Sequence, residues 1–150
     1  MGKKIDPTVL AKVIGTGYPA PFDEPCKRRE RQRLGEAAGL TQFGVNLLKL
    51  PPGEWSSQRH WHTAEDEFVF VVSGEVVLVT DQGEEVLRAG DCAGFPANDA
   101  NGHHLQNRSQ NVAFLLEVGS RHERDDCFYP DIDMFLPAGG PFKRRDGSAL

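Results

Sequence analysis

The central part of this chain lacks the 3.6-residue apolar period of helices and instead joins short apolar stretches through turn residues. From about residue 33 to residue 118, apolar segments alternate with Pro51-Pro52-Gly53, Ser73-Gly74 and Ala89-Gly90-Asp91. About eight or nine short strands at this spacing are typical of a β-sandwich or β-barrel. We therefore predict an all-β domain.

Two of the turns predict hairpins. The apolar segments EFVFVV and EVVLVT flank Ser73-Gly74, and the segments HHLQNRS and NVAFLLEV flank Gln110. Because short loops usually connect antiparallel neighbours, we expect the two strands of each pair to hydrogen-bond to one another.

The length of 150 residues is that of one domain with a sizeable core. Asp6-Pro7 predicts the start of a short helix, and Pro-rich chain follows it. Aromatic residues in the last segment would dock it onto the domain rather than leave it free. We therefore predict an N-terminal arm over residues 1–32, a barrel over residues 33–118 and a C-terminal wrapping tail over residues 119–150.

Charge and composition exclude several classes of protein. The net charge of −5 argues against a nucleic-acid surface, and the basic run Lys27–Arg33, which is interrupted by Glu30 and Gln32, is expected to be a solvated face. No apolar stretch approaches the length of a membrane span, and the N-terminus lacks the features of a signal peptide. Three widely spaced cysteines favour a reducing cytoplasm over a disulfide framework.

A cluster of metal-ligating residue types begins at His60. In a strand, His60 and His62 share one face, and a turn can bring Glu67 back beside them at the start of the next strand. Of the neighbouring His103 and His104, alternation favours His103 as a further ligand, because it shares a face with Leu105 and Asn107.

Each of these residues also has an ordinary interpretation. Isolated histidines are usually hydrogen-bonded structural residues, and a run of acids is usually a hydrophilic turn. The metal hypothesis is favoured because four of the five histidines lie in two short segments, each next to a predicted strand. Three histidines and a carboxylate would leave positions open for water or substrate.

The same residues resemble the two sequence motifs of the cupin family. Gly53, His60, His62, Glu67 and Gly74 follow the first motif, G(x)5HxH(x)3–4E(x)6G, with six residues instead of five after Gly53. The second motif, G(x)5PxG(x)2H(x)3N, is matched by Gly90, Pro96, His103 and Asn107. It departs at Asn98, which stands in place of a glycine, and by two added residues before the histidine.

The resemblance covers about residues 44–118. Within the family, the chain looks like the small single-domain bacterial cupins. The resemblance implies a jelly-roll β-barrel with extended arms that binds one divalent metal ion through His60, His62, Glu67 and His103. Manganese, iron, nickel, zinc and cobalt all accept such a ligand set, so the sequence does not identify the metal.

Two functions remain open at this stage. Cupin barrels carry metal-dependent isomerases, lyases, decarboxylases and dioxygenases, which would act here on a small anionic or sugar-like molecule. The alternative is a non-catalytic module that binds or senses a small molecule. Gln58, on the face of His60 and His62, and Asn107 are candidates for contacting that molecule, and Gln58 could equally hold an imidazole tautomer.

The segment EFVFVV is apolar on both faces, although a strand at the barrel surface needs only one apolar face. Either the arms of the chain or a second subunit must cover Phe68 and Phe70. Because cupins commonly pair in this way, we expect a homodimer.

Overall fold

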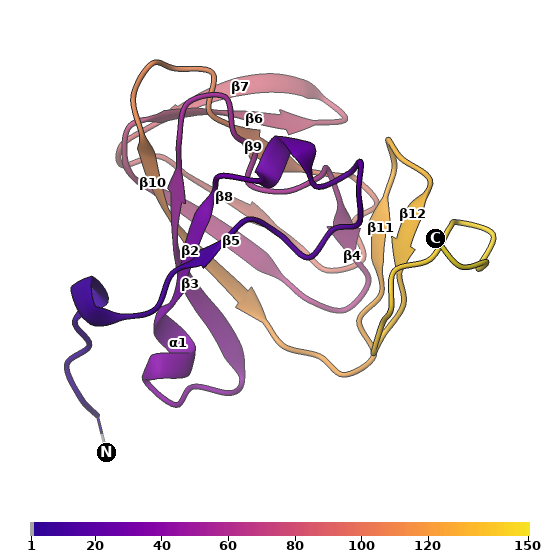
Figure 1. Ribbon diagram of the computed structural model, residues 1–150, viewed down its shortest axis with the longest axis horizontal. Coiled ribbons are helices and arrows are strands. Elements are labelled where there is room, and N and C mark those ends of the chain that lie inside the picture. The colour runs from indigo at the N-terminus through magenta and orange to yellow at the C-terminus, as the bar shows by residue number, and fades with distance from the viewer. Residues whose placement is uncertain (1) are drawn as a thin grey trace.

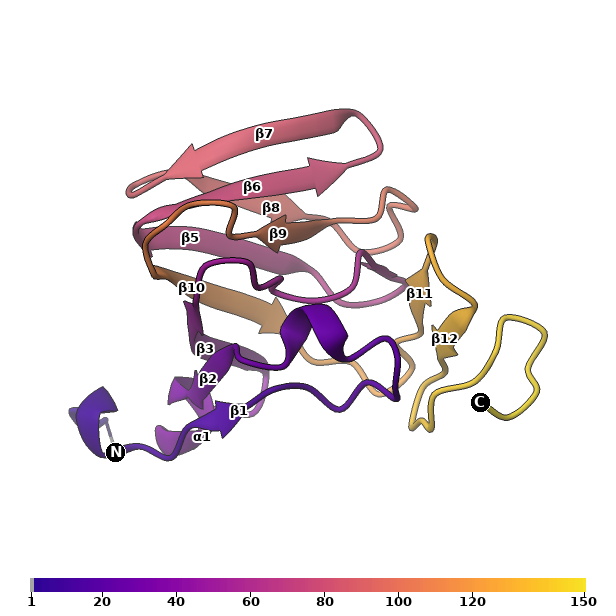
Figure 2. The ribbon, with the colours of Figure 1, turned by 45° about the horizontal axis from the view of Figure 1, so that its top comes forward.

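The computed structural model describes residues 2–150 and is built mainly of three β-sheets. The largest sheet has six strands in the order β1-β2-β3-β10-β5-β8. These strands are β1 (Val13–Ile14), β2 (Glu30–Arg33), β3 (Phe43–Leu50), β10 (Ala113–Ser120), β5 (Glu67–Ser73) and β8 (Cys92–Phe95). A second sheet of three strands, β7-β6-β9, lies across from it (Figures 1 and 2).

The second sheet comprises β6 (Glu75–Thr80), β7 (Gly83–Arg88) and β9 (His104–Gln106). Aliphatic side chains of both sheets form one buried core, with Leu48, Val71 and Leu115 from the first sheet and Val76 and Leu105 from the second. The alternation of inward and outward residues along each strand produces this core, since every second side chain points between the sheets.

Toward one end of the large sheet the inward-facing residues change from aliphatic to polar. On β10, Leu115 is fully buried at the register of Leu48, whereas Glu117, two residues later, pairs with Asn46. On β5, Glu67 at the start of the strand lines the interior cavity, two residues before the buried Val69. The interior therefore has a closed aliphatic half and an open polar half.

The two predicted hairpins are wrong. β5 pairs with β10 and β8, β6 pairs with β7 and β9, and β10 pairs with β3 and β5. At Gly74 the chain passes from one sheet to the other with a φ of +84°, and a Cβ there would lie 2.8 Å from the Cα of Ala113. The short turns thus connect sheets rather than neighbouring strands.

Both chain ends pack onto the domain. The third sheet, β12-β11-β4, is formed by β4 (Trp61–His62), β11 (Cys127–Tyr129) and β12 (Met134–Leu136). In Figure 2, β11 and β12 lie beside one end of the two larger sheets. Tyr129 and Met134 of this sheet form a second apolar cluster with Tyr18 and Phe22 of the N-terminal segment. Aromatic side chains therefore take part in packing the C-terminal segment against the N-terminal one.

The helical elements are short: 3₁₀ helices over Pro7–Val9 and Glu24–Cys26, and α1 (Leu34–Ala37). Asp6 caps the first of them, as its sequence predicts, by accepting a hydrogen bond from the Thr8 amide. Within residues 2–150 no helix has the length and apolar character needed to cross a membrane, and all three cysteines are free.

The basic run is a solvated face only in part: Lys27, Arg28 and Arg33 are exposed, but other residues of the run are not. Arg29 is only 5% exposed and Gln32 only 9% exposed. The reason is that β2 belongs to the large sheet. Arg29 lines an interior cavity, and Gln32, on the other face, donates a hydrogen bond to the Pro7 carbonyl oxygen of the N-terminal segment.

Candidate metal centre

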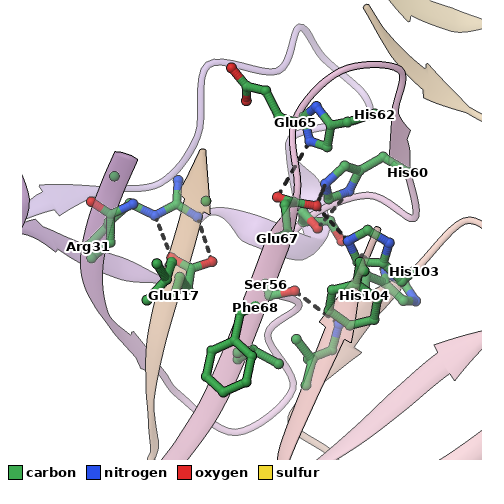
Figure 3. A pocket seen from close by; sticks show the side chains of 18 of the residues that line it. Arg31, Ser56, His60, His62, Glu65, Glu67, Phe68, His103, His104 and Glu117 are labelled. Atoms are coloured by element: carbon green, nitrogen blue, oxygen red, sulfur yellow. Dashed lines mark hydrogen bonds and ion pairs between the residues drawn. The ribbon is translucent and has the colours of Figure 1, made fainter. Parts of the chain in front are cut away.

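Three imidazole rings and one carboxylate meet at the polar end of the interior (Figure 3). The Glu67 carboxylate accepts the closest contact, 2.6 Å from its Oε2 to His103 Nε2. His60 Nε2 lies 3.3 Å from the same oxygen, and His62 Nε2 lies 3.4 Å from Oε1. Every one of these rings therefore turns its Nε2 toward the same carboxylate.

Local strand geometry positions the rings. His60 and His103 face each other in an isolated antiparallel bridge, joined by backbone hydrogen bonds of 3.1 and 2.9 Å. His62 ends β4, and the intervening Trp61 points to the other side, where it stacks on Phe128 with ring centroids 4.7 Å apart. The alternation expected from the sequence thus places His60 and His62 on one face, with ring centroids 5.0 Å apart.

Partners on the far side of two rings fix their orientation. His60 Nδ1 lies 2.8 Å from the Gln58 carbonyl oxygen, and His62 Nδ1 lies 2.6 Å from the Asp125 carboxylate. An Nδ1–H that donates to such acceptors leaves the Nε2 lone pair free to bind a metal ion. The ring of His103 is held instead by stacking on Phe95, 3.6 Å between centroids.

The electrostatics of the cluster are dominated by Glu67. Burial alone would raise the pKa of Glu67, but the imidazoles of His60, His103 and His62 hold that pKa well below its ordinary value. Burial alone would lower the pKa of His62, but its hydrogen bonds to Glu67 and Asp125 raise the pKa to about 9. A divalent cation entering the cluster would replace the proton that His62 carries.

The donor set fits a divalent transition metal. One ligand atom each from His60, Glu67 and His103 lies within 4.8 Å of the others, which is the spread that a single ion can bridge. Imidazole nitrogen and carboxylate oxygen suit manganese, iron, cobalt, nickel and zinc. His103 Nδ1 is buried without a hydrogen-bond partner, so the polar contact of this ring is the one that its Nε2 makes with Glu67.

Both a family model and a solved structure match this chain. A family model described as "Cupin domain" matches residues 46–119. A solved structure of a cupin-superfamily protein from Silicibacter pomeroyi, described as a sugar phosphate isomerase, is 46% identical, with a TM-score of 0.94 over 99% of this chain and 96% of that one. The chain belongs to the cupin superfamily. The predicted all-β jelly-roll fold is confirmed by the same matches.

Two further solved structures resemble this cupin. A protein from Acidithiobacillus ferrooxidans, provisionally described as a sugar phosphate isomerase, is 31% identical, with a TM-score of 0.72 over 77% of this chain and 74% of that one. A predicted oxalate decarboxylase from Thermotoga maritima is 20% identical, with a TM-score of 0.62 over 80% of this chain and 100% of that one, and so shares the fold. Among proteins of curated function, none matched the sequence.

The departure of this cupin from the second motif has a structural explanation. Asn98 has a φ of +62°, the left-handed conformation that glycine adopts most easily and asparagine tolerates. The backbone N–H of Asn98 donates to the His62 carbonyl oxygen over 2.8 Å. The loop therefore keeps a left-handed residue at the motif position and uses it to support a candidate ligand.

The structure separates the two neighbouring histidines that the sequence left as alternatives. His103 faces Glu67, whereas His104 Nδ1 lies 2.9 Å from the Ser57 carbonyl oxygen and its Nε2 contacts the Gln106 amide. Burial lowers the pKa of His104 to about 4, so the ring is neutral. His104 thus has its own partners away from the cluster.

Among residues 2–150, Gln58 and Asn107 are not part of the lining of the three cavities that border the cluster. The Gln58 amide donates to the Phe22 carbonyl oxygen over 2.8 Å, while its backbone carbonyl is the partner of His60 Nδ1. The Asn107 amide donates to the carbonyl oxygens of Leu50 and Asn111, both over 2.8 Å. Both side-chain amides therefore tie loops together.

Sequence reasoning missed Cys127 as a neighbour of the cluster. One ligand atom each from His60, His62 and Cys127 lies within 4.8 Å of the others, because Cys127 pairs with His62 between β11 and β4. Burial raises the pKa of this thiol to about 12, so it is protonated. Cys127 belongs to neither motif, and its nearness to His62 depends on how the tail folds back.

In the described part of the chain, three cavities border the cluster: one of about 170 Å³ adjoins Trp61 and Pro96, and two others share part of their lining. Of these two, one, of about 220 Å³, extends between the two large sheets, and the other, of about 660 Å³, lies between the cluster, the N-terminal segment and the tail. Arg31 and Glu117 line both of these two cavities. Across from the histidines, Arg31 Nε and Glu117 Oε1 form an ion pair of 2.9 Å (Figure 3).

Proposed function

We propose that this cupin binds one divalent metal ion through His60, His62, Glu67 and His103 and acts as a metal-dependent enzyme on a small anionic or sugar-like molecule. The observation that carries the proposal is the convergence of three Nε2 atoms on the Glu67 carboxylate, within 3.4 Å of it, at the wall of an accessible cavity. Structural ion clusters are normally sealed, whereas an open cluster leaves room for a substrate.

Isomerisation is the favoured reaction among the isomerase, lyase, decarboxylase and dioxygenase classes. The 46% identical protein from Silicibacter pomeroyi is described as a sugar phosphate isomerase, and the match extends over 99% of this chain. A bound divalent metal would supply Lewis acidity that polarises a substrate carbonyl. Manganese, iron, nickel, zinc and cobalt are the candidates.

The residues of the chain have distinct parts in this proposal. The Gln58 carbonyl and Asp125 hold the rings of His60 and His62 with Nε2 directed inward. Glu117 faces the same cavity from β10, and Arg31 holds its carboxylate through two hydrogen bonds of 2.9 and 3.2 Å. A carboxylate fixed in this way is a candidate to accept or return a proton at a substrate carbon.

The test combines metal analysis with an activity survey. Protein purified without a His-tag or chelator should contain about one metal equivalent by plasma mass spectrometry, and a panel of sugar phosphates, keto acids and oxyacids should reveal a substrate. Glu67→Gln should abolish turnover. If the protein binds metal and a panel member but turns over none, it is a binding or sensing module; absence of metal after reconstitution would contradict both versions.

We also propose that the protein is a homodimer formed through the outer face of β5. Phe68, Phe70 and Val72 on this face are 41%, 37% and 50% exposed, and Val118 of β10 lies next to Phe68 in register. A contiguous apolar sheet face of this kind favours a second subunit. Light scattering should give about twice the chain mass of 16.6 kDa, and a value near one chain mass would contradict the proposal.

The cytoplasm is the proposed location, since the cysteines Cys26, Cys92 and Cys127 are free. Proteins that function in oxidising compartments commonly convert their cysteines to disulfides. Fractionation of the source cells with an antibody to the protein tests this directly, and recovery from a secreted fraction would contradict it.

A further inference from the structure

Two arginines of the N-terminal segment face the larger cavity. Arg29 and Arg31 are two residues apart, and both line this cavity together with His60, His62 and Glu67. Arg29 is 5% exposed, so its guanidinium is removed from bulk water. A cation this deeply buried normally has a carboxylate partner.

Arg31 has such a partner and Arg29 does not. The Arg31 guanidinium binds both oxygens of Glu117, at 2.9 and 3.2 Å. Arg29 donates only to carbonyl oxygens, those of Gly15 over 3.0 Å and of Ser56. Within residues 2–150 no carboxylate oxygen lies in ion-pair range of Arg29.

The other acidic groups that line the cavity are mostly engaged elsewhere. Asp125 is held by His62 and by two backbone amides, Glu65 accepts from the His122 amide, and Glu67 faces the histidines. Glu123, the remaining acid of the lining, is exposed. The arginine side of the cavity therefore keeps one uncompensated positive charge.

The surroundings of Arg29 strengthen its attraction for an anion. The Arg29 cation is buried and lies near the charge of Arg31, and both of these lower the pKa of Arg29. Tyr18 and Tyr129, with ring centroids 5.7 Å apart, line the same cavity, and Tyr129 is buried. An anion entering here would meet the guanidinium at low local dielectric constant, where attraction is strong.

We propose that Arg29, which lies beside the charge-balanced Arg31–Glu117 pair, forms a subsite for the carboxylate or phosphoryl group of the substrate, while the oxygens at the other end of the substrate face the histidines and Glu67. The placement of the other end of the substrate at the histidines and Glu67 rests on the proposed function. A cavity of about 660 Å³ is of the size that holds a monosaccharide derivative. The substrate class is thus a small polyhydroxy or carbonyl compound with a terminal anionic group.

A matched set of three ligands tests the subsite. Glucose 6-phosphate, glucuronate and glucose carry a phosphoryl group, a carboxylate or a hydroxyl group at the same end of one sugar. Isothermal titration of the metal-loaded protein at constant ionic strength should show that at least one anion binds about tenfold or more tightly than glucose. The preferred anion identifies the group that the subsite accepts, and equal binding of all three overturns the proposal.

Substitutions locate the preference. Arg29→Met should reduce binding of the preferred anion to the level of glucose, while Arg29→Lys retains part of the preference. Arg108→Met is the matched control, because Arg108 is an exposed arginine whose partner is Glu84 on β7, away from both cavities. Retention of the full preference in Arg29→Met overturns the proposal. Because the comparison of ligands on the unmodified protein stands alone, poor folding of Arg29→Met does not remove the test.

The failures of this subsite and of the proposed function are distinguishable. Metal content, measured on the same samples, reports on the histidine cluster and is expected to be equal in the protein, Arg29→Met and Arg29→Lys. If metal is absent, titration with inorganic phosphate still tests the arginines, and phosphate binding that is lost in Arg29→Met supports the subsite alone. Metal binding with no anion preference supports the proposed metal centre alone.

Discussion

Leu115 and Glu117 are neighbours on the inner face of β10, but they belong to two regions with opposite requirements. Leu115 is fully buried among aliphatic side chains from both sheets, where packing has to be dense and dry. Glu117 lines a cavity and binds Arg31. One strand therefore contributes a side chain to each region. The difference indicates that the aliphatic half stabilises the fold, while the polar half is available for chemistry.

Removal of a candidate ligand should have the largest effect on the polar half. His60→Ala or His103→Ala should lower metal affinity by about 3–4 kcal/mol, because a bound ion distributes its binding energy over about four ligands. Plasma mass spectrometry should find metal near zero in both variants, while thermal unfolding of the metal-free proteins stays close to that of the metal-free parent. Full metal content in His103→Ala would exclude it as a ligand.

Truncation in the aliphatic half should have the opposite outcome. Leu115→Ala removes a fully buried side chain and should destabilise the fold by about 3 kcal/mol through lost contacts and a cavity. Denaturant unfolding measures this change, and the folded fraction should still contain about one metal equivalent. Loss of metal from folded Leu115→Ala would show that the two halves are coupled and would break the comparison.

Asn107 should behave as part of the stable region although the cupin motif includes it. Its amide donates to Leu50 and Asn111, and its oxygen accepts from Ser109. Asn107→Ala should therefore cost about 2 kcal/mol in stability, since several buried hydrogen bonds are lost. The Michaelis constant should stay the same. A raised Michaelis constant at unchanged stability would instead assign Asn107 to the substrate.

The smallest expected effect concerns the orientation of one ring. In Asp125→Asn, backbone amides of Ala64 and Glu65 keep the side-chain oxygen in place, so the new amide nitrogen faces His62 Nδ1. That nitrogen would donate to Nδ1 and move the ring proton to Nε2. Metal affinity should fall about tenfold.

The neighbouring Asp126→Asn is the control for this change, because Asp126 binds the Ala138 amide in the tail and does not touch His62. Competition with a fluorescent chelator measures the affinity of both variants. An equal loss of affinity in the two would show that the tail, rather than the ring proton, controls the site.

The parts of this protein that sequence patterns predicted are those determined by local periodicity. Alternation in a strand was enough to predict that His60 and His62 face the same way and that His103 differs from His104, since side-chain direction depends only on odd or even position. Cluster geometry agrees with both expectations. Turn chemistry was less informative, because Gly74 permits a tight turn without determining which sheet the next strand joins.

The residues near the site that the sequence did not predict lie in the N-terminal and C-terminal segments. Arg29 lies in a basic run that has the composition of a solvated surface, and Cys127 lies in a tail without periodicity. Their positions depend on β2 joining the large sheet and on β11 pairing with β4. Such contacts between distant segments leave no local pattern in a single sequence.

The candidate ligands come from distant parts of the fold, which has a consequence for the order of events in the cell. Glu67 comes from the six-stranded sheet, His62 from the small sheet that the tail completes, and His103 from the segment that leads into β9. These residues meet only after the sheets have packed, so the proposed metal site would not exist while the chain is emerging from the ribosome. On the proposed ligand set, metal would therefore bind late in maturation, after folding is complete.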